Sequence, residues 1–402
     1  MRIAFLTPYL PYPPDTGGKN RTYNLLKRLG QGHQVDLYVP AYEALRGGHG
    51  DLDEFCANIW IYAHQVRWSR RQLIRDKLTL TPATVLNFSR PETVKEMCSD
   101  LAKRHNDLVF VDELVMAPYA WELNGIPKVL ARQKADSLYF WDVALRCPWG
   151  RGKLWHLREA VLLRIYEPKV WSVYRHGIVV SEKERDLFLG IREELDLCLA
   201  PNGVDLDFFS FKPPNVTEVP VVLCYGTMSY YPNVDAVLYF FREVYPLIKK
   251  RVPTFRVMVV GQDPGPEIRG LQKEYDNVMV TGTVPDMRPY LEKSTLVVVP
   301  VRIGRGTRLK IPEAMAVGRP VVSTSVGCEG LDVGDGQHLL IADSPWDFAD
   351  RVARLMEDAA LRRYLAENGR RLVEESYSWD SICARVERFC RKVVASENRV
   401  AD

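Results

Sequence analysis

The chain has 402 residues, of which 47% are hydrophobic and 26% charged, and this length predicts two or three domains. The composition is that of a globular protein, which excludes collagen, disordered chains and small disulfide-rich scaffolds. The formal net charge is only +3, with the positive excess in the first half, so we expect no nucleic-acid partner.

The first 40 residues predict a strand, a loop, a helix and a second strand. Apolar residues form strand-length runs at 3–6 and 35–39, and residues 23–29 carry apolar side chains at helical spacing. Further strands are expected at 59–63, 108–111, 129–131 and 177–181. Short strands that alternate with helices indicate an α/β fold with a parallel sheet.

The second half repeats this pattern. Strand-length apolar runs occur at 221–225, 255–260, 278–281, 296–300, 321–324 and 339–341. We therefore expect two Rossmann-like domains, one over 1–200 and one over 201–378. The amphipathic segment 379–397 predicts a last helix that could pack on either domain.

The eight cysteines include no Cys-x-x-Cys pair, and no histidine spacing is typical of a zinc site. The apolar run after Met1 is too short for a secretory signal, and no stretch of about 20 apolar residues could span a bilayer. We therefore expect a reduced cytoplasmic protein that could touch a membrane only at its surface.

Two glycines follow the first predicted strand and open the first predicted helix. Gly17 and Gly18 let the backbone approach a ligand closely, the amides at a helix start favour an anion, and Lys19 adds a positive charge. An ordinary turn between a strand and a helix also uses glycine, so the loop alone does not decide between the two interpretations. Its spacing matches neither a dinucleotide-binding loop nor a P-loop.

A second glycine-rich loop lies within residues 300–318 and leads from a predicted strand into a helix. Its amides can wrap a diphosphate, and Arg308 or Lys310 can neutralise the charge. Glu313 lies one turn into the helix, where a carboxylate would repel phosphate, so neutral hydroxyls such as those of a ribose are its expected partners. The alternative is that Glu313 only stabilises the helix as a negative charge near its N-terminus.

These two loops together resemble glycosyltransferase family four, whose members are retaining enzymes of the GT-B fold. The resemblance is carried by residues 14–29 and by the motif over 304–322. Shorter landmarks come in the family's order, at 180–184, 201–205, 208–209, 225–226, 232–233, 259–261 and 280–286. The resemblance covers nearly the whole chain, and its details are similar to sugar transferases of bacterial exopolysaccharide clusters.

The resemblance implies a nucleotide-diphosphate-sugar donor on the second domain, an acceptor on the first, a reaction in the cleft between them, and no essential metal or other cofactor. Lys310 and Arg308 would stabilise the leaving diphosphate, and Glu313 would hold the ribose hydroxyls. The other residues assigned to the donor on this basis are Gly17, Gly18, Lys19, Gly226, Gly282, Val284, Arg305, Gly306, Thr307 and Leu309.

Two positions depart from the family's pattern. Arg305 stands where the motif has its first glutamate, eight positions before Glu313, which bears on how the sugar is gripped. Gln133 stands where many relatives carry a histidine near the donor sugar. A glutamine can bind a sugar hydroxyl but cannot titrate, so we assign Gln133 to the reacting centre and expect the leaving phosphate to take the acceptor's proton.

Two basic segments of the first half bear on the acceptor. Residues 65–78 carry five basic side chains and one acidic one, interleaved with Trp68 and aliphatic residues, and 146–175 adds three tryptophans and more positive charge. Such segments suit an anionic membrane surface or a lipid-diphosphate acceptor, although the same residues also occur as core and solvated surface. We expect peripheral contact with the inner face of a membrane.

The sequence therefore predicts a retaining glycosyltransferase that moves a sugar from a nucleotide diphosphate to a glycan or lipid-linked acceptor in bacterial polysaccharide or glycolipid biosynthesis. An epimerase or phosphorylase could use the same fold. A non-catalytic nucleotide-sugar-binding subunit of a polysaccharide assembly complex is also compatible with Arg305 and Gln133.

Overall fold

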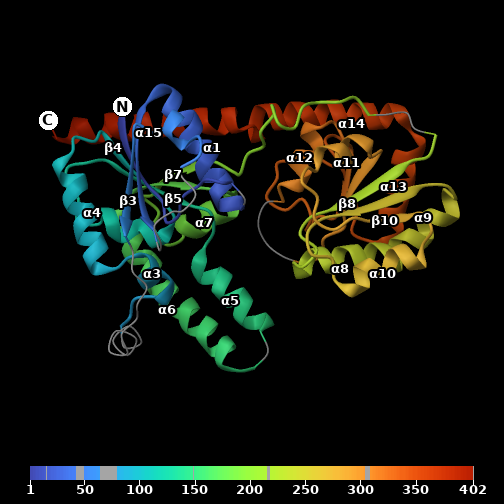
Figure 1. The fold of residues 1–402 in the computed structure, drawn as a ribbon, viewed down its shortest axis with the longest axis horizontal. Coiled ribbons are helices and arrows are strands. Elements are labelled where there is room, and N and C mark those ends of the chain that lie inside the picture. The colour runs from blue at the N-terminus through green and yellow to red at the C-terminus, as the bar shows by residue number, and fades with distance from the viewer. Residues whose placement is uncertain are drawn as a thin grey trace. The chain divides into compact units, whose positions relative to one another are not determined.

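The computed structural model divides the chain into two compact units. Unit 1 comprises residues 1–201 and 382–402, and unit 2 comprises residues 202–381 (Figure 1). The residues that the structure describes are 1–14, 16–41, 49–63, 79–147, 149–214, 218–303 and 308–401.

Unit 1 is built on a parallel sheet. Within the described residues the sheet has seven strands in the order β3-β2-β1-β4-β5-β6-β7. Short apolar runs form these strands because a parallel sheet is buried on both faces. They are β1 (Arg2–Leu6), β2 (Gln34–Ala41), β3 (Asn58–Ala63), β4 (Leu108–Asp112), β5 (Lys128–Arg132), β6 (His176–Val179) and β7 (Asp196–Leu199).

The order of the strands reverses between β1 and β4, so the loops after these two strands diverge. The ends of parallel strands at such a reversal form a natural crevice for a ligand. The helices of unit 1 are α1 (Gly17–Gly32), η1 (Leu52–Glu54), α3 (Ala83–Phe88), α4 (Pro91–Lys103), η2 (Leu114–Ala120), α5 (Asp136–Arg146), α6 (Arg151–Val173) and α7 (Glu182–Leu189).

The last helix, α15 (Trp379–Ala401), belongs to unit 1 from Ile382 onward. Its apolar face is buried, and polar contacts hold it to the sheet end: Arg385 donates to the carbonyl oxygen of Leu199 at 3.1 Å, and Lys392 lies 3.0 Å from the Asp196 carboxylate. Glu387 lies 3.1 Å from Nε2 of His33, at the end of α1. From Ile382 onward, the last helix thus packs on unit 1.

Unit 2 repeats the plan with six strands in its described part, in the order β10-β9-β8-β11-β12-β13, all parallel. Alternate residues of β8 enter two apolar clusters, Val222 and Cys224 one and Leu223 and Tyr225 the other, so both faces of the sheet are covered. The strands are β8 (Val221–Tyr225), β9 (Arg256–Val260), β10 (Val278–Val280), β11 (Leu296–Val299), β12 (Val321–Ser323) and β13 (Leu340–Ile341).

Helices connect these strands as the alternating pattern predicts. They are α8 (Tyr231–Tyr239), η3 (Phe240–Val244), α9 (Tyr245–Arg251), α10 (Pro266–Glu274), α11 (Arg288–Lys293), α12 (Lys310–Ala316), α13 (Pro345–Glu357), α14 (Ala359–Leu372) and η4 (Val373–Tyr377). The sequence reasoning missed β7, whose run Asp196-Leu-Cys-Leu is short and follows a pair of glutamates.

Candidate functional site

Two glycines bring the carboxyl ends of β8 and β9 close together in unit 2. Gly226 and Gly261 have φ angles of 143° and 156°, and the amide of Gly226 donates to the carbonyl oxygen of Val260 at 3.0 Å. A Cβ at position 261 would overlap the backbone of Gly226. Only glycine fits both positions, and the pair leaves the backbone open for a ligand's close approach.

Lys310 points its ammonium at this backbone. Its Nζ donates to Oδ1 of Asn233 at 2.9 Å and would lie 3.0 Å from a Cβ placed at Gly226. Burial lowers the pKa of Lys310 to about 8. Within the described residues the hydrogen-bond partner of this half-buried ammonium is therefore a neutral amide.

Glu313 lies one turn after Lys310 on α12, and Tyr225 links the two. The Tyr225 hydroxyl donates to the carbonyl oxygen of Lys310 at 2.6 Å and lies 3.1 Å from Oε2 of Glu313. Burial raises the pKa of the Glu313 carboxyl. In this structure the Glu313 carboxylate therefore contacts a hydroxyl of the protein itself, and its assignment to the ribose stays a prediction.

The other predicted donor residues of unit 2 are placed in part. Arg308 is half-buried, and burial lowers its pKa. Leu309 precedes α12, and the carbonyl oxygen of Gly282, at a φ of 91°, accepts from the amide of Gly261 at 3.2 Å. Val284 packs at the edge of the apolar cluster on that face of the sheet. Arg305, Gly306 and Thr307 lie outside the described residues.

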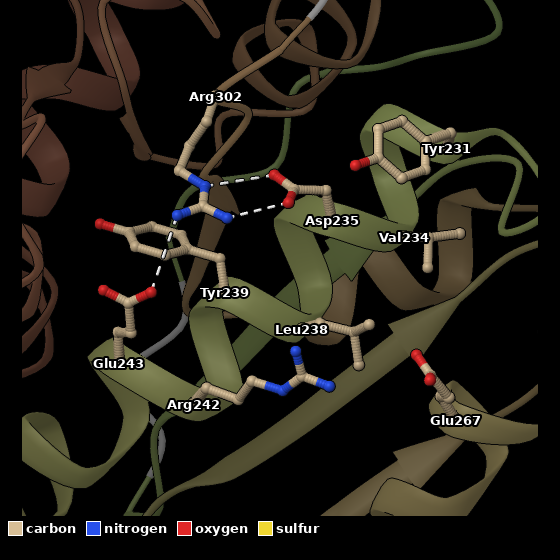
Figure 2. A pocket seen from close by; sticks show the side chains of 9 residues that line it. All are labelled: Tyr231, Val234, Asp235, Leu238, Tyr239, Arg242, Glu243, Glu267 and Arg302. Carbon is tan, nitrogen blue, oxygen red and sulfur yellow. Dashed lines mark hydrogen bonds and ion pairs between the residues drawn. The ribbon is translucent and has the colours of Figure 1, made fainter. Parts of the chain in front are cut away.

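Arg302 belongs to a separate hollow of about 260 Å³ beside α8, drawn in Figure 2. Its guanidinium makes two hydrogen bonds to Asp235, at 2.8 and 3.2 Å, lies 3.6 Å from Glu243, and sits 4.2 Å from the centre of the Tyr239 ring. This basic residue of the second loop is therefore engaged within the protein, and it ties the end of β11 to α8.

In unit 1, Gly18 and Gln133 come together after β1 and β5. A Cβ at Gly18 would lie 2.5 Å from the Tyr9 hydroxyl and 3.9 Å from Nε2 of Gln133. Gly17 has no such neighbour, and the amide of Lys19 donates to Oγ1 of Thr16 at 3.4 Å, which caps α1. A larger residue at position 18 would therefore require the Tyr9 ring to shift.

Two acidic residues at the end of β4 were missed by the sequence reasoning. Asp112 is buried and accepts from the hydroxyls of Thr22, at 2.6 Å, and Thr7, at 3.4 Å. Glu113 has a φ of 76°, and burial, reinforced by the Asp112 charge, raises its pKa to about 8. A pair of carboxylates directly after a buried strand is a signal that the sequence contains.

The acceptor segments are placed only in part. Residues 65–78 fall within 64–78, outside the described residues. Of the tryptophans in 146–175, Trp149 and Trp155 are exposed, but Trp171 is fully buried against Phe188. The expectation that Trp171 faces a membrane is therefore wrong, because the second half of α6 packs into the core of unit 1.

Among the described residues, no three His, Cys, Asp or Glu side chains gather as metal ligands would. Within the same part of the chain, no helix combines the length and apolar character needed to cross a bilayer.

Comparison with known proteins identifies the enzyme class. Residues 219–358 match the family model described as Glycosyl transferases group 1. An uncharacterized 44.6 kDa protein from the cps region of Klebsiella pneumoniae is 22% identical over 94% of this chain and 96% of its own. The lipopolysaccharide 1,2-N-acetylglucosaminetransferase of Salmonella typhimurium is 27% identical over 48% of this chain and 55% of its own.

Solved structures show the same fold. Sucrose-phosphate synthase of Thermosynechococcus elongatus superposes with a TM-score of 0.67 at 20% identity, covering 98% of this chain and 100% of its own. The Anabaena protein Alr3699/HepE, in complex with UDP, gives 0.66 at 16% identity over 98% and 100%. The predicted GT-B architecture of two Rossmann-like units is confirmed, and the protein is a glycosyltransferase.

Proposed function

We propose that this enzyme transfers a sugar from a nucleoside-diphosphate sugar held by unit 2 to a glycan or lipid-linked acceptor served by unit 1, with retention of anomeric configuration. The observation that carries the proposal is the half-buried Lys310 ammonium, which faces the glycine-lined backbone with a neutral amide as its partner. A partly desolvated cation of this kind is stabilised most by an anion such as a diphosphate.

The chemistry follows from the leaving group. As the bond between the sugar and the diphosphate breaks, negative charge grows on the phosphate oxygen, and Lys310 with Arg308 would stabilise it. The acceptor oxygen attacks the same face of the sugar and passes its proton to that phosphate oxygen, so no titrating side chain is required. Gln133 would bind a hydroxyl of the transferred sugar.

The nucleoside end of the donor suits the neighbouring groups. Glu313 would accept hydrogen bonds from the ribose hydroxyls, as it lies against the Tyr225 hydroxyl here. Gly282 and Val284 would form the edge for the base. Lys310 and Arg308 supply positive charge at the diphosphate, so we propose that turnover needs no metal. We also propose that the reaction takes place at the cytoplasmic side of a membrane.

Replacing Lys310 tests the proposal directly. In Lys310→Ala, UDP binding should weaken by roughly 10- to 100-fold, because a charged hydrogen bond to phosphate is lost, while uridine binding stays unchanged. Isothermal calorimetry measures both, and Lys273→Ala, an exposed lysine on α10, is the control. Equal losses for UDP and uridine would contradict a phosphate role.

The alternative of a non-catalytic donor-binding subunit rests on Gln133, which cannot titrate. Slow release of free nucleotide from a panel of UDP-, GDP- and ADP-sugars separates the two functions. A transferase should hydrolyse one donor slowly in the absence of acceptor. Binding of a donor without release of nucleotide, even with membrane extract as the source of acceptor, would favour the non-catalytic subunit. In a separate test, unchanged turnover of the Gln133→Ala variant would show that Gln133 is not part of the reacting centre.

A further inference from the structure

Helices α5 and α6 form an antiparallel pair that projects from the sheet of unit 1 (Figure 1). Large apolar side chains on this hairpin are exposed to an unusual degree. Trp149, in the connection between the helices, is 82% exposed. Within the described residues, the exposed large apolar side chains of the hairpin are Tyr139, Trp141, Leu145, Trp149, Leu154, Trp155, Val161 and Ile165.

Packing within unit 1 accounts for only one face of α6. Leu163, Tyr166 and Val170 are buried in the core. Leu154, Val161 and Ile165 recur on another side of the same helix, at spacings of seven and four residues, and are exposed. An amphipathic surface helix would carry polar residues there, so this second apolar stripe has no explanation in the fold of unit 1.

Contacts between side chains of the two helices and their connection hold the end of the hairpin farthest from the sheet. Phe140 of α5 meets the Trp155 ring of α6 edge to face, with ring centres 5.6 Å apart. Lys153 donates to the carbonyl oxygen of Cys147 at 3.3 Å, and its ammonium lies 4.9 Å from the centre of the Trp149 ring. The exposed indole is therefore presented beside a fixed cation.

The charge on this end of the hairpin is positive. Residues 141–155 contain three basic side chains and one acidic one. Arg151 is exposed, and Lys153 is half-buried next to Trp149. Tryptophan and tyrosine with flanking lysine or arginine are the residues that occupy the boundary between water and lipid, and the cations complement anionic headgroups.

We propose that the α5–α6 hairpin inserts its exposed aromatic and aliphatic side chains into the headgroup region of an anionic bilayer. Arg151 and Lys153 then contact lipid phosphates, and Trp149 lies at the level of the interface. This membrane contact rests on the proposed function, in which unit 1 serves a lipid-linked acceptor. The hairpin would be the surface that brings unit 1 to that acceptor. The helices lie on the bilayer and do not span it.

Flotation with vesicles tests the hairpin without nucleotide or acceptor. The intact protein should float with vesicles of phosphatidylglycerol and phosphatidylethanolamine, and only weakly with phosphatidylcholine. Combining Leu145→Ser, Trp149→Ser and Leu154→Ser should reduce binding at least tenfold, because apolar surface that the bilayer would cover is removed. Combining Arg151→Ser and Lys153→Ser should weaken binding to the anionic vesicles roughly fivefold per charge.

The control changes exposed aromatic residues of unit 2, Trp346→Ser with Tyr364→Ser, which should leave flotation unchanged. All replaced side chains of the triple variant are exposed, so its thermal unfolding midpoint should match that of the parent. Absence of flotation in the parent, or equal flotation of the triple variant, would overturn the proposal. So would a triple variant that floats normally but loses self-association in sedimentation, because a second copy would then cover the hairpin.

The outcome is independent of the donor site. Lys310→Ala should float as the parent does, whatever happens to its UDP binding. A parent that binds UDP but not vesicles would reject the hairpin proposal and leave the proposed function standing.

Discussion

At the scale of single residues, Lys310 illustrates a conflict between stability and function. Its pKa is lowered to about 8 by burial, from an ordinary value near 10.5, so folding at neutral pH desolvates a charge. The charge is fully present in the unfolded chain up to about pH 10. The folded state is therefore penalised below that pH, and the penalty vanishes only as pH rises toward the unfolded pKa.

Lys310→Met should consequently stabilise the ligand-free protein at pH 7, by about 1–3 kcal/mol, while it weakens diphosphate binding as Lys310→Ala does. Urea unfolding at pH 7 and pH 10.5 measures the effect, which should shrink at the higher pH because the folded lysine is then neutral and the unfolded lysine is only about half charged. A variant less stable than the parent at pH 7 would show that the ammonium has a stabilising partner.

Glu113 offers the opposite titration. Its pKa is raised to about 8, so the folded state holds a proton that the unfolded state releases near pH 4.5. The free energy of unfolding should therefore fall as pH rises from about 4.5 to 8. Glu113→Gln keeps the neutral form at every pH and should remove this part of the pH dependence, which denaturant titrations at a series of pH values would reveal. Identical pH profiles would contradict the raised pKa.

The residues of the donor site were predictable to different degrees. Lys310, Arg308 and Glu313 lie in one continuous motif, so the sequence alone predicts that they belong to the same site. Asn233 and Tyr225 come from other elements, α8 and β8, and only the fold shows that they orient the ammonium and the carboxylate of α12. Glu113 was not predicted although the pair Asp112-Glu113 is visible in the sequence, because the φ of 76° and the burial that set this carboxyl apart appear only in the structure.

At the scale of elements, the ends of β8 and β9 constrain each other. A Cβ at Gly261 would overlap a backbone oxygen, which cannot swing away as a side chain can. Gly261→Ala should therefore lower the stability of unit 2 by about 2–4 kcal/mol and disturb UDP binding. Gly265→Ala is the matched control, since a Cβ there meets nothing within 4 Å. Equal unfolding midpoints would show that the two strand ends can separate freely.

The contact between α8 and the end of β11 gives a second prediction for an element. Asp235 and Arg302 hold the chain directly before residues 304–307, the segment assigned to the donor from sequence. Asp235→Ala should raise the KM for the donor several-fold with a smaller effect on the free energy of unfolding, because an exposed ion pair contributes little to stability. A loss of stability without a change in KM would make the pair purely structural.

The strands and helices themselves followed from apolar periodicity, with instructive exceptions. β7 was not predicted because the glutamates before it are typical of a loop. In the structure it pairs with β6 and forms an edge strand of the sheet. Trp171 was grouped with Trp149 and Trp155 because all three lie in one basic segment of the sequence. Sequence alone does not show that α6 is buried in its second half and exposed in its first.

At the scale of the whole molecule, the predicted donor residues of unit 2 and those of unit 1 come from separate cores. A chain ending at residue 381 would lack the segment that covers His33 and the carbonyl end of β7. Its unit 1 should unfold at a lower temperature, while UDP should still protect unit 2, because binding to a folded state raises stability by mass action. Calorimetry would show two separated transitions, and loss of UDP protection would contradict this division of labour.

The return of the chain to unit 1 at Ile382 also sets an order of assembly during synthesis. A ribosome makes all of unit 2 before it makes the segment of α15 that packs against α1 and β7. Unit 2 is one uninterrupted stretch and can fold as soon as it emerges, whereas the nascent sheet of unit 1 must wait with an apolar face uncovered. The domain translated first is thus the one completed last.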